Sequence, residues 1–383
     1  MSASPLLGVP GAVAAEGIDA GLAAHYGNPL IEQRHLEAGT ALVDLSTQGV
    51  LTVTGPDRLS WLNSLASQKL DRLDAGGSAE TLFLDPQGRI EHDVRLLDDG
   101  VSTWMLVEAA ELAPLQAWLD RMRFMLRVEL ADRTQDYATL GILNTDAAAL
   151  GITPAAPNGV ELVWRDPWAA GAVGGWQYAE PVDHPSAEWN WSLVLVDRAE
   201  LPALADRVGS GSLQAAGTLA LEALRIAAWR PRRAAEVDEK SIPHELDWLR
   251  TAVHLDKGCY RGQETVAKVH NLGHPPRRLV MLHLDGSDTV LPARGDEVLA
   301  ERTRPESEAG WQACGEITSS AIHHELGPIA LAVIRRGVPV QAPLRVRTAE
   351  TGEVIAAAQQ VIVPPKAGAA AGIPRMPRLG IRR

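Results

Sequence analysis

The spacing of apolar residues predicts that strands and helices alternate through the first part of the chain. In the segment "LVDLSTQGVLTVTGPDRLSWLNSL", apolar side chains alternate along a strand that includes Leu51 and Val53 and ends at the turn Gly55-Pro56-Asp57. From Leu59 to Ala66 the apolar residues recur at helical spacing instead. The segment therefore predicts a strand, a turn and a helix with its apolar residues on one face.

A hairpin, a further strand and a second helix are expected next. The segment "TLFLDPQGRIEHDVRLL" predicts two strands joined at the turn Asp85-Pro86-Gln87-Gly88. The segment "STWMLV" predicts another strand, and helical spacing continues from Leu112 to Leu126. Strands and helices thus alternate in an α+β manner.

The second half of the chain changes in character twice. The Pro- and Gly-rich segment "GITPAAPNG" marks a boundary or a long loop, and the strand "WSLVLV" and the helices "LPALADRV" and "AGTLALEALRIAAW" follow it. After "NLGHPPRR", short strands separated by turn residues are typical of a compact β-barrel or sandwich. We therefore expect α+β segments at residues 1–150 and 151–274, a β-barrel or sandwich at 275–363 and a disordered basic tail at 364–383.

Composition and charge narrow the class of protein. The chain has 383 residues, 46% of them hydrophobic and 22% charged, and no apolar run approaches the ~20 residues of a membrane helix. The N-terminus lacks the basic start and apolar block of a signal peptide, so we expect a soluble, cytoplasmic protein. The formal net charge of −12 opposes nonspecific binding to nucleic acid, and no direct nucleic-acid or membrane partner is expected.

Cysteine usage limits what metal chemistry the chain can supply. Its two cysteines, Cys259 and Cys314, are expected to be free thiols in a reducing compartment. They cannot provide the four ligands of a typical iron–sulfur cluster, nor do they form a CxxC pair for zinc. No metal site is predicted, and a cluster bound here would need ligands from outside the chain.

The segment "LDKGCYRGQETVAKVH" places Cys259 between two glycines. Gly258 and Gly262 allow backbone turns closed to other residues and a close approach to a ligand. The segment "GQETVAKVHNLG" predicts a helix that stops at its last glycine, so Cys259 lies just ahead of a helix N-terminus. Unpaired N–H groups there, together with Lys257 and Arg261, would stabilise a thiolate.

Spacing alone leaves two interpretations of this segment open. A small residue between glycines packs well, and free cysteine is among the residue types most often buried, so Cys259 could be structural rather than reactive. Gln263 and Glu264 could likewise cap the start of the helix rather than contact a ligand.

The octapeptide "KGCYRGQE", Lys257 to Glu264, resembles the signature of the YgfZ family, folate-binding proteins related to the T-protein of the glycine cleavage system. The likeness extends to "HYGNPLIEQRHLEAGTALVDLS" near the start, to "LEALRIAAWRPRR" and "SIPHELDWL" before the signature, and to "CGEITSSA" and "LGPIALAVIRRG" in the C-terminal part. It covers about residues 25–360. The octapeptide is long and discriminating, whereas the C-terminal motif is shared by T-protein relatives.

The resemblance implies a T-protein-like ring of three domains, two α+β and one C-terminal β-barrel, with tetrahydrofolate or a derivative in the central opening. It implies a role in assembling or repairing iron–sulfur clusters, including those of radical enzymes that modify tRNA. Iron–sulfur client or assembly proteins are then partners. Cys259 inherits the role of the residue on which the family depends, with Lys257 beside it. The folate-binding residues that we expect are Gly258, Tyr260, Gly262, Gln263, Glu264 and Arg225.

One departure from the T-proteins lies in the predicted hairpin. These relatives carry a catalytic aspartate on the strand after a "GGI" turn, and here "GRIEHDVRL" puts His92 at that position. Alternation predicts two faces of the strand: one with Ile90, His92, Val94 and Leu96, and the other with Glu91, Asp93 and Arg95. A histidine in an apolar row is commonly a satisfied core or pocket residue, although imidazole can also act as a base near neutral pH. Loss of the fixed negative charge counts against aminomethyl transfer by the T-protein route.

A second departure lies in "LRIAAW". T-protein relatives have a glutamate here that hydrogen-bonds the pterin, and Ala227 cannot accept those bonds. Glu222 or backbone groups could serve instead. Arg225 matches the family's arginine and could face the ligand. The arginines that could meet the glutamate tail of a folate, or simply be solvated, are Arg230, Arg232 and Arg233.

Three classes of function therefore compete. The first is a folate-binding factor for iron–sulfur cluster assembly or repair, with no conventional turnover of its own. The alternative is a tetrahydrofolate-dependent aminomethyltransferase or demethylase, in which His92 would be the candidate base. The third is a hydrolase or acyltransferase with Cys259 as nucleophile and His244, His254 or His270 as base.

Overall fold

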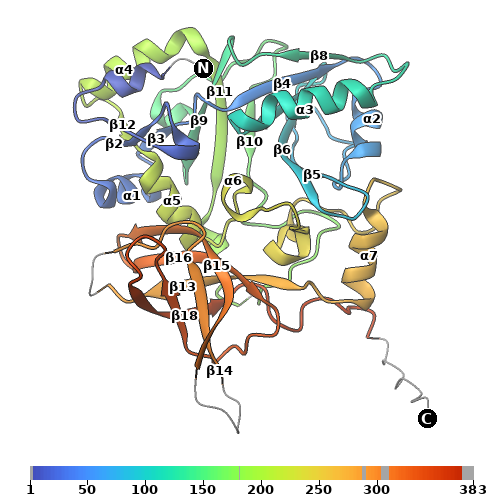
Figure 1. Ribbon diagram of the computed structural model, residues 1–383. Helices are drawn as coiled ribbons and strands as arrows, with labels where there is room; N and C mark the ends of the chain where they lie inside the picture. The colour runs from blue at the N-terminus through green and yellow to red at the C-terminus, as the bar shows by residue number, and fades with distance from the viewer. Residues whose placement is uncertain (1–2, 181, 287–289, 303–309, 373–383) are drawn as a thin grey trace.

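Two five-stranded sheets and a closed six-stranded barrel enclose a shared core (Figure 1). The computed structural model describes residues 3–180, 182–286, 290–302 and 310–372. Within these ranges, no helix is long and apolar enough to cross a membrane.

The first sheet has the strand order β10-β11-β9-β3-β12. Its strands are β3 (Ala41–Asp44), β9 (Tyr137–Leu143), β10 (Val163–Arg165), β11 (Trp191–Asp197) and β12 (Gln214–Ala216). β12 runs parallel to β3, and the other pairs are antiparallel. α4 (Leu201–Gly209) packs on one face, and α1 (Pro29–Glu37) and α5 (Thr218–Ala227) pack on the other. The sheet thus joins strands from both sides of residue 150, where the sequence predicts a boundary.

The second sheet has the order β5-β6-β7-β4-β8. Its strands are β4 (Gly49–Thr54), β5 (Ser78–Leu84), β6 (Ile90–Asp98), β7 (Ser102–Val107) and β8 (Glu129–Asp132). α2 (Arg58–Leu65) and α3 (Ala109–Met122) cover one face and bury Leu62, Leu115 and Leu119 there. The strand, helix and hairpin expected in this region are confirmed, although α3 ends before Leu126.

The prediction that Ile90 shares a face with His92 and Val94 is wrong. Phe83 pairs with His92, but Leu84 pairs with Ile90, so Glu91 is the extra residue of a β-bulge. The bulge turns Ile90 toward the central core, whereas Val94 packs in the core beneath α2 and α3. Alternation along a strand holds only where the register is unbroken.

The C-terminal part closes into a barrel in the order β13-β16-β15-β14-β17-β18. Its strands are β13 (Arg277–Leu284), β14 (Glu297–Arg302), β15 (Gly310–His323), β16 (Gly327–Arg335), β17 (Leu344–Arg347) and β18 (Val354–Val361). Closure leaves no sheet edge, which explains how such short strands form a stable unit. The predicted barrel is therefore present.

The described part of the predicted disordered tail is packed against the protein. α7 (Gln263–Leu272) precedes the barrel, and the amide of Ala370 donates a hydrogen bond of 2.9 Å to the carbonyl of His270 in that helix. Ala367 is buried. Residues 373–383, the rest of that prediction, lie outside the described residues.

The remaining elements are short. They are β1 (Val13–Ala14), β2 (Ala23–His25), α6 (Arg233–Glu236) and 3-10 turns at Pro5–Gly8, Gly17–Asp19, Ala148–Leu150, Pro185–Glu188, Arg198–Glu200, Pro243–Leu246 and Trp248–Arg250. The central core takes Leu193 from the first sheet, Leu82 from the second and Leu331 from the barrel. Because all three units contribute to it, loops from each of them meet near the middle of the molecule.

Candidate functional site

Cys259 is exposed, and it lies on a loop that the neighbouring side chain of Lys257 attaches to the body of the protein. The buried side chain of Lys257 donates hydrogen bonds from Nζ to the carbonyl oxygens of Asn63, Ala66 and Gln68, at 2.7, 2.6 and 2.9 Å. These carbonyls lie at and just after the C-terminus of α2, where helix carbonyls lack partners within the helix. Burial lowers the pKa of Lys257 to about 8. Lys257 thus fixes the loop to the second sheet's helix layer.

The residue after the cysteine anchors the other side of the loop. Tyr260 is buried, and its ring centroid lies 5.2 Å from Lys257 Nζ. Gly258 and Cys259, between these two anchors, are both exposed. The buried side chains of Lys257 and Tyr260 therefore fix the loop on either side of the exposed Cys259 thiol.

α7 begins directly after the octapeptide's second glycine. Gly262 has a φ of +84°, and a Cβ at this position would lie 2.6 Å from the carbonyl oxygen of Asp85 in the β5–β6 turn. Neither Gln263 nor Glu264 caps the helix, because no side-chain cap is present at Gly262. Gln263 Nε2 instead donates to the carbonyl of Lys257 at 3.3 Å, and Glu264 is exposed. The glycine is required for the close contact between α7 and the hairpin.

The two cations expected beside the thiol have other partners. Lys257 is directed at backbone carbonyls, as described above, and Arg261 forms an ion pair of 2.7 Å with Glu91. Among the described residues, no hydrogen bond joins Cys259 to a histidine: His244 bonds the carbonyl of Val266, and His270 bonds Tyr178. The nucleophile–base arrangement of a cysteine hydrolase is therefore not assembled in this part of the chain.

A cavity of about 270 Å³ lies beside the octapeptide loop. Trp176, Tyr260, Gln263 and His270 line it, and Trp176 is 46% exposed. Of the expected folate-binding residues, the structure therefore places Tyr260 and Gln263 at a cavity, Gly258 and Glu264 at the surface, and Gly262 against the hairpin.

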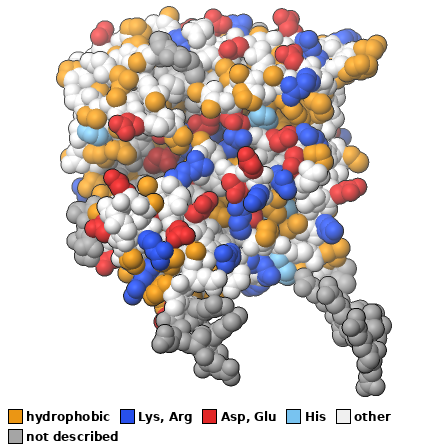
Figure 2. Space-filling model, in the orientation of Figure 1, with side chains coloured by type: hydrophobic (Ala, Val, Ile, Leu, Met, Phe, Trp, Pro, Cys, Tyr) orange, Lys and Arg blue, Asp and Glu red, His pale blue; other side chains and the backbone are white. Residues whose placement is uncertain are grey.

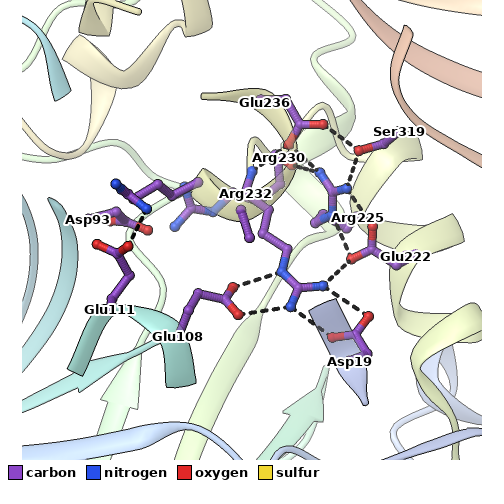
Figure 3. Close-up of polar contacts among 12 residues, drawn as sticks. Asp19, Asp93, Glu108, Glu111, Glu222, Arg225, Arg230, Arg232, Glu236 and Ser319 are labelled. Carbon is purple, nitrogen blue, oxygen red and sulfur yellow. Dashed lines mark hydrogen bonds and ion pairs between the residues drawn. The ribbon is translucent and has the colours of Figure 1, made fainter. Parts of the chain in front are cut away.

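The guanidinium of Arg232 is surrounded by carboxylates from three separate segments of the chain (Figure 3). Its guanidinium bonds Asp19, Glu108 and Glu222 at distances between 2.7 and 3.2 Å. Burial alone would raise the pKa of Glu222, but Arg225 and Arg232 lower it to about 2. The cation and its carboxylates thus neutralise one another, and Glu222 is not free to replace the missing pterin-binding glutamate.

Arg225 is also enclosed by protein groups (Figure 3). It bonds Glu222 at 2.5 Å, Glu236 at 3.0 Å and the hydroxyl of Ser319 at 2.7 Å. Arg230 bonds Glu80 at 2.5 Å and Asp166 at 3.0 Å. The arginines that were candidates for binding a folate therefore already have carboxylate partners.

The central cavity bounded by this network has a free volume of about 60 Å³. Its lining is chemically suited to a polar ring, because Trp189 and Trp191 stack beside it and the buried atoms Gln48 Oε1 and Arg230 Nη1 lack hydrogen-bond partners. Ligand pockets, however, are usually about 300–1,000 Å³ in volume. With the side chains in this arrangement, the cavity does not fit tetrahydrofolate.

His92 and Asp93 point to opposite sides of the second sheet. His92 lies under α3, where Nδ1 is 2.8 Å from Glu111 Oε2. Asp93 lies on the face of the central core, as its cross-strand neighbour Leu82 does, and its Oδ1 has no hydrogen-bond partner. Burial raises the pKa of Asp93 to about 7. Matching the hairpin to the T-protein pattern puts His92 at the aspartate's position, whereas the carboxylate on the inner face belongs to the next residue, Asp93.

Ala227 lines a different cavity, one of about 650 Å³ between the end of α5 and the β15–β16 turn. Trp189 and His323 also line it. The helix position at which T-protein relatives have a glutamate therefore does not face the Arg232 network here.

The chain is similar in sequence to several known proteins. A family model described as the GCVT N-terminal domain matches residues 22–150. An aminomethyltransferase of Prosthecochloris aestuarii is 24% identical over 335 residues, which are 82% of this chain and 84% of the relative. The mitochondrial iron–sulfur cluster assembly factor IBA57 homolog of Mycosarcoma maydis is 26% identical over 332 residues, 77% of this chain and 75% of that protein.

The structure is similar to the crystal structure of glycine cleavage system aminomethyltransferase T from Bartonella henselae. The TM-score is 0.69 at 18% sequence identity, and the match covers 93% of this chain and 94% of the other. The predicted fold class, α+β with a C-terminal β-barrel in a T-protein-like arrangement, is confirmed. The sequence is similar both to aminomethyltransferases and to iron–sulfur assembly factors.

Proposed function

We propose that this protein is a YgfZ-type factor that supports the assembly or repair of iron–sulfur clusters, including those of radical enzymes that modify tRNA. The observation that carries the proposal is the exposed thiol of Cys259, held between the buried Lys257 and Tyr260. Similarity to an iron–sulfur assembly factor supports it. No other cysteine of the described residues is exposed, since Cys314 lies in the barrel core.

The geometry suits a thiol that acts on a partner. A single cysteine supplies one ligand, so the other ligands of a cluster must come from a client or an assembly protein. The loop lowers the entropic cost of that encounter because Lys257 fixes its backbone through three hydrogen bonds. The role of the described residues is therefore to present a positioned sulfur at the surface.

Tetrahydrofolate or a derivative is a separate part of the prediction. Aminomethyltransferase relatives and the fold support folate as a ligand of the superfamily. The central cavity does not accommodate it while Arg232 bridges Asp19, Glu108 and Glu222. No step of the function proposed here passes through folate.

A tetrahydrofolate-dependent aminomethyltransferase or demethylase is the second candidate, and one observation favours it. Asp93 keeps a buried carboxylate on the inner face of the second sheet, with a pKa of about 7 that suits proton transfer. His92 is not on that face. Asp93 rather than His92 would therefore be the acid–base group of this route.

The two candidates are separated by one set of variants. We expect Cys259→Ala to fold normally and to abolish support of a cluster-dependent tRNA-thiomethylating enzyme, because the exposed sulfur is removed without disturbing packing. The control is Cys314→Ala, which removes the other thiol and should retain that support. The readouts are the thermal midpoint of each purified variant and the modified-base content of tRNA in cells that carry only that variant.

Full tRNA modification with Cys259→Ala would contradict the proposal. Formation of methylene-tetrahydrofolate from an amine donor by the purified protein, lost in Asp93→Asn, would favour the aminomethyltransferase instead.

A further inference from the structure

A groove of about 670 Å³ lies outside the central cavity, between β6, α3 and the end of α6. Its lining includes His92 from the second sheet, Trp118 from α3 and Arg233 from α6. The volume is within the range of about 300–1,000 Å³ that small-molecule sites occupy. Figure 2 shows acidic and basic side chains mixed across the middle of the molecule. The net charge of the groove therefore depends on which of its charged side chains are paired with one another.

His92 is held in one orientation at this groove. It is only 7% exposed, and Nδ1 lies 2.8 Å from Glu111 Oε2. Arg233 bonds the other oxygen of Glu111, and Arg233 Nε donates to the carbonyl of Glu91 at 3.1 Å. A carboxylate at Nδ1 favours the tautomer with the proton on Nδ1, which leaves the lone pair on Nε2. Nε2 has no protein partner and is not among the solvent-sealed atoms, so it is available to a ligand.

Two arginines give the groove an excess of positive charge. The side chains of Arg89 and Arg121 line it, and neither forms an ion pair or hydrogen bond with another described residue. The carboxylates of the lining are mostly engaged: Glu91 pairs with Arg261, and Asp238 pairs with Arg277. Asp85 accepts hydrogen bonds from the amides of its own turn, at Gln87 and Arg89. Glu239 alone among these carboxylates has no such partner, so the unpaired cations outnumber the unpaired anions.

The rest of the lining is apolar. Ile90, Pro114, Ala117 and Val237 form walls beside the indole of Trp118. A ligand with a flat apolar body would be in contact with these side chains, while an anionic end would be within the reach of Arg89 and Arg121. Guanidinium groups bind carboxylates and phosphates through paired hydrogen bonds, which gives orientation as well as affinity.

We propose that this groove is a binding site for an organic anion, an aromatic or heteroaromatic molecule that bears a phosphate or a carboxylate. Arg89 and Arg121 bind the anionic group, the walls around Trp118 contact the ring, and Nε2 of His92 accepts a hydrogen bond from the ligand. Glu111 is a positioning residue, since it acts through His92. The site is separate from Cys259 and does not depend on the function proposed above.

Calorimetric titration of the full chain with two probes tests the site. The probes are adenosine monophosphate, which carries a phosphate, and 4-aminobenzoyl-glutamate, which carries carboxylates. We expect saturable binding of at least one probe, weakened about tenfold or more in Arg89→Ala and in Arg121→Ala because a charge-assisted hydrogen bond is lost. The matched control is Arg165→Ala, which removes an exposed arginine of β10, outside this groove.

His92 is tested by two substitutions that keep the fold. Asparagine can replace Nδ1 toward Glu111 but has no atom at Nε2, so His92→Asn should weaken binding. His92→Gln places a polar group near Nε2 and should restore part of the affinity. Thermal midpoints close to that of the native protein show that either variant is folded.

The titrations show whether the groove binds an organic anion and which anionic group it prefers. Binding of only the phosphate, only the carboxylate or both supports the proposal and identifies the anionic group. Absence of saturable binding of both probes at millimolar concentrations overturns it, as does binding that Arg89→Ala, Arg121→Ala and His92→Asn leave unchanged. Binding should be equal in Cys259→Ala, so failure of this site and failure of the proposed function are distinguishable.

Discussion

Asp247 illustrates at the scale of one residue how burial creates sensitivity to pH. It lies in the left-handed region with a φ of 56°, its Oδ1 accepts a hydrogen bond of 2.6 Å from the amide of Tyr178, and its Oδ2 has no partner. Burial raises its pKa to about 7. The folded state therefore holds this proton more tightly than the unfolded state does. The stabilisation is complete below the ordinary pKa near 3.8 and is lost as pH rises toward 7.

Asp247→Asn should remove this part of the pH dependence. Asparagine tolerates the left-handed region and can still accept the bond from Tyr178, but it carries no charge. We expect the variant to gain about 1–3 kcal/mol in the free energy of unfolding at pH 8 and little at pH 4. Thermal midpoints across that range give the measurement, with the exposed Asp256→Asn as control. An unchanged pH profile would show that Asp247 is ionised at no cost.

At the scale of elements, the position of Cys259 depends on the contact between α7 and the β5–β6 hairpin. Gly262 brings the two together, because a side chain there would meet the carbonyl of Asp85 at 2.6 Å and Gly88 Cα at 3.0 Å. Gly258, four residues earlier, has no atom within 4 Å of where its Cβ would lie. Two glycines that look equivalent in the octapeptide therefore have different structural requirements.

This difference predicts unequal effects of the same substitution. Gly262→Ala should lower the free energy of unfolding by about 1–3 kcal/mol, since it adds both a left-handed alanine and a clash with backbone. Gly258→Ala should change it by less than about 0.5 kcal/mol. Chemical unfolding and the rate of Cys259 alkylation by iodoacetamide would be compared for the two variants. If Gly262→Ala lowered the free energy of unfolding as little as Gly258→Ala does, the hairpin would be able to move away from the added methyl group without cost.

At the scale of the whole molecule, a buried network of an ion pair and hydrogen bonds joins α5, α6 and the barrel. Arg225 of α5 bonds Glu236 of α6 at 3.0 Å and Ser319 of the barrel at 2.7 Å, and Ser319 also bonds Glu236. Removing one partner from such a cluster leaves a charge buried without compensation, which is more costly than the loss of an exposed pair.

Arg225→Met should therefore destabilise the protein by about 3–5 kcal/mol, because Glu222 and Glu236 lose their shared cation. The control is Arg347→Met, which breaks the pair with Glu297, an interaction of 3.2 Å between side chains about half exposed. That change should cost at most about 1 kcal/mol. Thermal midpoints and limited proteolysis between α6 and the barrel would measure both. Similar midpoints for the two variants would argue that the central network contributes no net stability.

The local elements of the fold were within reach of the sequence. Apolar spacing determines β4, α2 and the β5–β6 hairpin, and glycine at Gly262 signals the turn before α7, because these depend on neighbours in the chain. The short C-terminal strands separated by turn residues likewise predict a barrel or a sandwich, and the structure contains the barrel.

Only the tertiary structure decided what each functional side chain faces. The bulge at Glu91 lies within a local hairpin, but it breaks the alternation on which a period of two depends. The pairing of β3 with β9 and β12 arises from contacts between distant segments, which periodicity does not encode. The same holds for two cations. Lys257 was expected beside a thiolate and Arg232 at the glutamate tail of a folate, but they are bound by carbonyls and by carboxylates from distant parts of the chain. Local preference is written along the sequence, whereas the partner of a buried charge is set by the packing that brings remote groups together.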